Sequence, residues 1–130
     1  MIDVGVVGSS GYTGLELLRI LSQHPEINKI LITAGRSKKD QMDDIVRHLI
    51  GKNTLFSCEL NSREFDKCDV VFFATPHGVA IENAEHLINK GIKVIDLSAD
   101  FRLKDSSDFK KWYGKEHTKK KLLKEAVYGL

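Results

Sequence analysis

The feature that most constrains the fold of this 130-residue chain is a glycine-rich turn close to its first residue. Gly8, Gly11 and Gly14 recur at intervals of three residues in the string GSSGYTG. An apolar, β-branched run occupies residues 2–7 before the turn, and apolar residues recur at helical spacing in residues 13–23 after it. A strand, a glycine turn and a helix in this order are typical of the first unit of a dinucleotide-binding domain.

The chemistry of the turn supports that interpretation. Glycine has no Cβ atom, so it permits a tight turn and lets a pyrophosphate approach the backbone closely. The helix that follows offers unpaired N–H groups and the positive end of its dipole. Ser9, Ser10 and Thr13 can add hydroxyl donors or cap this helix. The alternative is a glycine turn that only packs the strand against the helix.

The rest of the pattern predicts an α/β domain. Strands are expected at residues 28–34, 54–60, 69–74 and 93–97, and helices at 39–50, 79–89 and 105–113. Because the strands alternate with helices and are apolar on both faces, they favour a parallel sheet with right-handed crossovers. We therefore predict one domain over residues 1–130, a doubly wound parallel sheet of the Rossmann type with three α/β/α layers.

The residues after the 28–34 strand discriminate between the two nicotinamide cofactors. An acidic side chain at this place accepts a hydrogen bond from the ribose 2′-hydroxyl of NAD, whereas basic side chains receive the 2′-phosphate of NADP. Here Arg36, Ser37 and Lys38 follow the strand, and no carboxylate occurs before Asp40. Arg36 can form a forked pair with a phosphate, Ser37 can donate to it, and Lys38 adds a point charge. The pattern favours NADP(H), with a solvated loop as the alternative for Lys38.

A second loop, after the 69–74 strand, ends at the same edge of the predicted sheet, where ligands of such folds bind. It contains Pro76, His77 and Gly78. Pro76 rigidifies the loop, and Gly78 lets the backbone approach a ligand beside the start of the next helix. His77 has no visible partner, so we expect it to contact a cofactor or to serve only the loop rather than to donate a proton.

A third loop follows the 93–97 strand and contains Ser98 and Arg102. An arginine just beyond a strand end is suited to holding an anion. The alternative for Arg102 is a structural ion pair with Asp96 or Asp100.

The sequence offers no convincing nucleophile and no metal site. Covalent reduction of an activated acyl group needs a thiolate activated by a base. Cys58 and Cys68 are the two cysteines, and their spacing fits neither a metal nor a redox motif. Cys58 lies in a weak strand, and Cys68 precedes a buried strand at the edge opposite the ligand loops, so neither position suits attack.

Composition and charge favour an ordinary cytoplasmic domain. Twenty basic and 18 acidic residues give a net charge of +2, and the aromatic residues lack the basic interleaving of a nucleic-acid surface. No apolar run approaches the ~18 residues of a membrane span, and nothing resembles a signal peptide. Residues 115–124 are lysine-rich and are expected to be a flexible excursion, whereas residues 126–130 are expected to dock against a further domain.

Four strings in the chain converge on one family. VGSSGYTGLELLRIL, TPHG, IDLSADFRL and AVYGL occur in this order and together span essentially the whole chain. In these strings the chain resembles the cofactor domain of the N-acetyl-γ-glutamyl-phosphate reductases, which belong to the semialdehyde dehydrogenase group. The resemblance implies NADPH-dependent reduction of N-acetyl-γ-glutamyl phosphate, an acyl phosphate, to the semialdehyde in arginine biosynthesis.

The resemblance also implies roles for single residues. The cofactor phosphates would be lined by Gly8, Ser10, Gly11, Tyr12, Thr13 and Gly14. The 2′-phosphate would face Arg36, Ser37 and Lys38, and the nicotinamide side would face Pro76, His77 and Gly78. Ser98 and Arg102 belong to the string that supplies an arginine near the substrate phosphate.

The chain departs from the family at its end. Members of the family are more than twice as long, and their catalytic cysteine and histidine would lie beyond Leu130, so no catalytic residue is assigned here and these 130 residues are expected to be inactive alone. The full-length protein is expected to form a homo-oligomer. The alternatives are aspartate-semialdehyde dehydrogenase, a homologue acting on a carrier-protein-bound substrate, and a non-catalytic NADP-sensing module.

Overall fold

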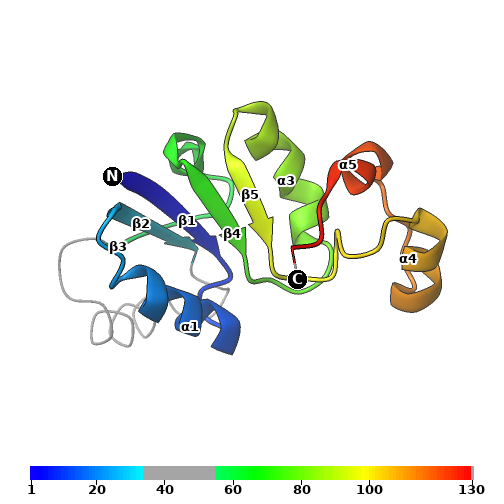
Figure 1. The fold of residues 1–130 in the computed structure, drawn as a ribbon, viewed down its shortest axis with the longest axis horizontal. Coiled ribbons are helices and arrows are strands. Elements are labelled where there is room, and N and C mark those ends of the chain that lie inside the picture. Colours follow the sequence, from blue (N-terminus) through cyan, green and yellow to red (C-terminus); the bar gives the residue numbers. More distant parts are fainter. Residues whose placement is uncertain (34–54, 130) are drawn as a thin grey trace.

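The computed structural model describes residues 1–33 and 55–129 and places five parallel strands in one sheet (Figure 1). The strands are β1 (Ile2–Val7), β2 (Ile27–Thr33), β3 (Leu55–Cys58), β4 (Val70–Phe73) and β5 (Lys93–Asp96). Their order is β3-β2-β1-β4-β5, and every pairing is parallel. The doubly wound parallel sheet predicted from the sequence is confirmed.

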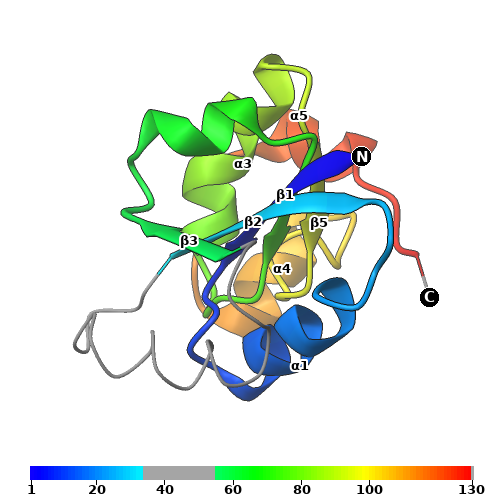
Figure 2. The same cartoon turned by 90° about the vertical axis from the view of Figure 1, so that its left-hand side faces the viewer.

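Helices cover both faces of this sheet, as the three-layer prediction requires (Figure 2). On one face lies α1 (Tyr12–Leu21), and on the other lie α3 (Val79–Asn89) and the short 3-10 helix η1 (Arg63–Lys67). Two further helices, α4 (Ser106–Tyr113) and α5 (Lys120–Glu125), follow β5. Among the helices of the described residues, none has the length and apolar composition needed to cross a membrane.

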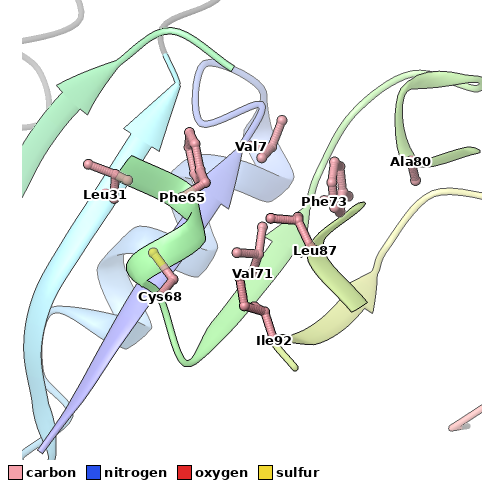
Figure 3. Packing of buried hydrophobic residues seen from close by; sticks show 9 residues of the cluster. All are labelled: Val7, Leu31, Phe65, Cys68, Val71, Phe73, Ala80, Leu87 and Ile92. Atoms are coloured by element: carbon pink, nitrogen blue, oxygen red, sulfur yellow. The ribbon is translucent and has the colours of Figure 1, made fainter. Parts of the chain in front are cut away.

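The core consists of two apolar clusters, one on each face of the sheet. Leu18 of α1 packs with Val4, Val6 and Ile30 on the first face. Figure 3 shows the second cluster, which lies under α3 and η1 and contains Val7, Leu31, Phe65, Cys68, Val71, Phe73, Ala80, Leu87 and Ile92. Neighbouring residues of β1 therefore enter opposite clusters, and this is why the strand reads as a continuous apolar run.

The order of the strands reverses at β1. From β1 the chain passes to β2 on one side, whereas β4 pairs with β1 on the other side. In open parallel sheets, ligands bind outside the carboxyl ends of the strands at the point where the order reverses. The loops after β1 and β4 therefore border the place where a ligand is expected.

The structure corrects one expectation about the end of the chain. Residues 115–124 are not a flexible excursion, because they include His117 and most of α5, and the side chains of His117 and Leu123 are fully buried. The 3-10 helix η1 has no counterpart among the predicted elements, since five residues are too few to establish a helical period. The predicted helix at 39–50 lies outside the described residues.

Candidate functional site

The site is built around Gly8, where the chain leaves β1 and turns beside the loop that follows β4. The backbone of Gly8 has a φ of +86°, and a Cβ atom added there would lie 2.4 Å from the carbonyl oxygen of Ala74. No other residue type fits such a close contact between two backbones. Gly8 therefore brings the loops after β1 and β4 together at the carboxyl edge of the sheet, the edge at which the strands end.

Thr33, the last residue of β2, holds the glycine turn in place. Its hydroxyl accepts a hydrogen bond from the Gly8 N–H at 3.0 Å, and its carbonyl accepts one from the Ser9 hydroxyl at 2.8 Å. Ser9 is fully buried, so its hydroxyl is a brace within the chain and not a donor for a ligand or a cap for the helix. Sequence reasoning missed Thr33 because its partners lie more than 20 residues away.

The N-terminus of α1 is left open by this arrangement. Its N-cap residue is Gly11, no side chain caps it, and its first turn carries no acidic residue. Of the two roles open to Ser10 and Thr13, capping the helix is not what the structure shows. Both side chains are exposed, as is Tyr12, whose relative exposure is 96%. An uncapped helix N-terminus presents free N–H groups and the positive end of the dipole, which together favour a bound anion.

The glycines at either side of this N-terminus differ in what surrounds them. A Cβ atom at Gly14 would lie 2.4 Å from the carbonyl oxygen of Gly8, so this residue lets α1 approach the turn closely. A Cβ atom at Gly11 would meet nothing nearer than 4.0 Å, again the oxygen of Gly8. Gly14 is thus required for packing, whereas the space in front of Gly11 is open. The residues present fit a phosphate group in that space.

The loop after β4 contains Pro76 and His77, both exposed, and Gly78, the N-cap residue of α3, which has a φ of +100°. Unlike α1, helix α3 has its N-terminus occupied. The buried carboxylate of Asp100 accepts the Gly78 N–H at 2.8 and 2.9 Å and the Ile81 N–H at 3.2 Å. The backbone donor of Gly78 is therefore used within the chain, and of these two helices only α1 offers an open N-terminus to an anion.

The loop after β5 is braced by Ser98. Its hydroxyl donates to Asp96 at 3.0 Å and accepts the Asp100 N–H at 3.1 Å, and its own N–H donates to Asp96 at 2.9 Å. Burial raises the pKa of the Asp96 carboxyl, and the hydrogen bonds from Ser98 act in the opposite direction. The structure therefore shows Ser98 as a support of the loop.

Arg102 stands at the far end of this loop and is exposed. Its guanidinium lies 6.0 Å from the ring centre of Tyr128 and forms no ion pair with Asp96 or Asp100, which are both described. The ion-pair alternative is thus not what the structure shows. Arg102 lines a groove of about 980 Å³ between β5 and residues 126–129, and its charge is available to an anion there.

Neither cysteine has the surroundings of a nucleophile. Cys68 is buried at the amino end of β4, opposite the ligand loops, and burial raises the pKa of its thiol to about 11. Cys58 ends β3 and packs against the core, and burial also raises its pKa. A thiol with a raised pKa has little reactive thiolate near neutral pH. Within the described residues, no group of three or more His, Cys, Asp or Glu side chains could hold a metal ion.

The structure thus brings the glycine turn and the Pro76–Gly78 loop together at one edge, with Ser98 and Arg102 on the next loop along. Arg36, Ser37 and Lys38 lie outside the described residues, which stop at Thr33, three residues before Arg36. A glycine turn that leads from the central strand into an open helix N-terminus, at the switch point of a parallel sheet, defines a dinucleotide-binding domain.

Comparison with known proteins gives the family. The chain belongs to the semialdehyde dehydrogenase family, because the description "Semialdehyde dehydrogenase, NAD binding domain" matches residues 3–130. It is therefore the NAD(P)-binding domain of that family, and the resemblance drawn from the four strings is confirmed.

Two similar sequences carry the same name. The chain is 52% identical over all 130 residues to the N-acetyl-gamma-glutamyl-phosphate reductase of Nitrosomonas eutropha and 50% identical to that of Polynucleobacter asymbioticus. It spans only 38% and 37% of the lengths of these two proteins.

Solved structures share the fold. Aspartate semialdehyde dehydrogenase II from Vibrio cholerae, complexed with ASA, superposes with a TM-score of 0.61 at 16% identity, over 78% of this chain and 32% of that one. Aspartate semialdehyde dehydrogenase with NADP from Candida albicans gives a TM-score of 0.58 at 21% identity, over 82% and 32%. At these identities the likeness concerns the fold alone.

Proposed function

We propose that residues 1–130 are the NADP(H)-binding domain of an N-acetyl-γ-glutamyl-phosphate reductase. The identity of about 50% across the whole chain to reductases of that name supports the reaction. The observation that carries cofactor binding is the open N-terminus of α1 behind Gly11. The solved neighbours, including the aspartate semialdehyde dehydrogenases, share too little sequence identity with this chain for their substrates to be proposed for it.

The proposed binding mode assigns each loop one part of the cofactor. The first turn of α1 and the glycine turn hold the pyrophosphate, with Ser10, Tyr12 and Thr13 exposed beside it. Arg36, Ser37 and Lys38 hold the 2′-phosphate, and the Pro76–Gly78 loop faces the nicotinamide. When bound, the nicotinamide supplies the hydride that reduces the acyl group to the aldehyde.

The substrate would lie at the loop after β5. Arg102, exposed and without a carboxylate partner among the described residues, is suited to hold the phosphate of an acyl phosphate as it leaves. Ser98 keeps the loop in the shape that presents Arg102. We further propose that a protein as long as the relatives has a second part besides these 130 residues. That remaining part supplies the nucleophilic cysteine, the catalytic histidine and the contacts of a homo-oligomer. The full-length protein would act in the cytoplasm.

Exposed apolar side chains at the end of β5 and at residues 127–128 fit contact with that remaining part. Ile95, Leu97, Val127 and Tyr128 are each more than two fifths exposed. They lie along the groove between β5 and residues 126–129. Apolar surface gathered in this way is typical of an interface rather than of a solvated surface.

The choice of cofactor is tested by Arg36→Ala. We expect the chain to bind NADPH more tightly than NADH, and the variant to lose about tenfold or more of that preference, because a charge-assisted hydrogen bond to phosphate contributes about 1.5–3 kcal/mol. Titrations that follow nicotinamide fluorescence measure both affinities. Lys39→Ala, three residues further along the chain, is the matched control and should keep the preference. Equal affinities of the unaltered chain for NADPH and NADH would contradict the assignment of this loop.

Turnover is tested by mixing the 130-residue chain with NADPH and N-acetyl-γ-glutamyl phosphate. We expect no acyl-phosphate-dependent loss of absorbance at the nicotinamide band, because Cys58 is half-buried and Cys68 buried, and burial raises the pKa of both thiols. NADPH must still bind in a parallel titration, so that inactivity is separated from failure to bind. Oxidation of NADPH that depends on the acyl phosphate would show that these residues hold a complete active site.

A further inference from the structure

Asp100 connects the two loops that would hold the cofactor and the substrate. Its side chain has no exposed surface, although it belongs to the loop after β5. Among the described residues its carboxylate accepts three hydrogen bonds, all from the start of α3, from Gly78 and Ile81. A buried carboxylate is retained at a favourable energy only when such donors replace its water. The loop after β4 is therefore fastened directly to the loop after β5.

His77 lies against the same carboxylate. Its Nδ1 atom is 4.0 Å from Oδ1 of Asp100, and its ring packs on Tyr113 of α4, with 4.9 Å between the ring centres. The His77 side chain remains about half exposed, at 52%. Asp100 and Tyr113 thus restrict the ring from two sides and leave the rest of it accessible at the carboxyl edge of the sheet.

The backbone carbonyl of Asp100 is held by His117. The N–H of Lys119 donates to Nδ1 of His117, so Nε2 carries the proton and donates to the carbonyl oxygen of Asp100 at 2.8 Å. The rings of Phe101 and Phe109 pack edge-on against this imidazole. The chain after β5 therefore encloses Asp100 rigidly, and it does so two residues before Arg102.

We propose that Asp100 is a positioning residue, which orients His77 and the Gly78 turn toward the nicotinamide end of the cofactor and fixes them relative to Arg102. The inference rests on the proposed function and deepens it. A helix cap that served stability alone would not need a half-exposed imidazole packed 4.0 Å from one of its oxygens. The expected consequence is that loss of the carboxylate weakens only the contacts made to the nicotinamide half.

The test compares two ligands on the 130-residue chain. NADPH carries the nicotinamide, whereas 2′-phospho-ADP-ribose keeps the adenosine, the 2′-phosphate and the pyrophosphate but lacks it. We expect Asp100→Asn to weaken NADPH binding about tenfold relative to 2′-phospho-ADP-ribose. Asp69→Asn is the matched control, because Asp69 also accepts a backbone N–H, that of Asp3, at the opposite edge of the sheet. It should leave the ratio of the two affinities unchanged.

A double-variant cycle shows whether Asp100 acts through His77. In a His77→Ala background, Asp100→Asn should change the ratio of the two affinities much less, because only the Gly78 turn then remains for Asp100 to orient. If Asp100→Asn does not fold, Tyr113→Leu and Tyr113→Phe give the same test, because the first removes the ring that packs on His77 and the second retains it. Tyr113→Leu should weaken NADPH binding relative to binding of 2′-phospho-ADP-ribose. Tyr113→Phe should keep the ratio of these two affinities seen in the unaltered chain.

Each outcome decides one claim. Equal weakening of both ligands by Asp100→Asn, or an undiminished effect without His77, would overturn the positioning role and leave the proposed function standing. If the unaltered chain binds neither ligand, the proposed function fails first and the inference fails with it.

Discussion

Gly11→Val is expected to abolish NADPH binding while the chain still folds. A Cβ atom at Gly11 would lie no nearer than 4.0 Å to any described residue other than its two chain neighbours, so a side chain fits the fold there, but it fills the space in front of the α1 N-terminus. We expect affinity for NADPH to fall more than about a hundredfold, because the pyrophosphate can then no longer reach the helix N–H groups. The free energy of unfolding should change by only about 1 kcal/mol, since valine is a poor N-cap residue.

Two measurements separate these effects. Titration with NADPH reports the affinity, and thermal unfolding reports the stability of the same sample. Gly129→Val is the control, because a Cβ atom there also meets nothing within 4 Å but lies far along the chain from the turn. NADPH binding retained by a folded Gly11→Val variant would mean that the glycine turn only packs the strand against the helix.

Gly14→Ala is expected to destabilise the domain by about 3 kcal/mol, the opposite of the usual effect of alanine in a helix. Replacing glycine by alanine inside a helix ordinarily stabilises it by about 1 kcal/mol. Here the new Cβ would lie 2.4 Å from the oxygen of Gly8 and 2.7 Å from the Cα of Ser9. Both contacts are with backbone, so α1 must move away from the turn and part of its packing is lost.

Urea unfolding of Gly14→Ala beside Gly11→Ala checks this claim. Both variants add one methyl group to the same turn, but the nearest atom at Gly11 is 4.0 Å away. We expect a shift of less than about 1 kcal/mol for Gly11→Ala. Similar midpoints for the two variants would show that α1 does not approach the turn as closely as the structure indicates.

The parts of the fold that could be predicted from the sequence are those whose signal is local. The runs that became β1 and β4 are buried on both faces, so they read as apolar in the chain itself. The glycine turn can be predicted equally well, since its three glycines occur within seven residues. For the same reason the predicted 79–89 helix agrees with the bounds of α3.

The parts that could not be predicted depend on partners far along the chain. The sequence indicates Asp100 only as an ion-pair partner of Arg102, whereas its actual partners, Gly78 and Ile81, precede it by about 20 residues. His117 and Leu123 are buried, but their neighbours in the sequence are mostly lysines. The polar composition of that segment therefore gives no sign that these two side chains are buried. Only the assembled fold shows that these residues support the loop after β5.

The central position of β1 also has a consequence for how the domain folds. Val4 pairs with Ile30 on one side and with Val70 on the other, so the second pairing closes a much longer loop. For a flexible chain the difference in closure entropy is about 0.8 kcal/mol, which favours formation of the β1-α1-β2 unit before β4 joins it. The Thr33 hydrogen bonds to Gly8 and Ser9 form within that early unit, and the contact between Gly8 and Ala74 waits for β4. The glycine turn is thus assembled by a local nucleus, while the close approach of the loops after β1 and β4 forms only in a later, long-range step.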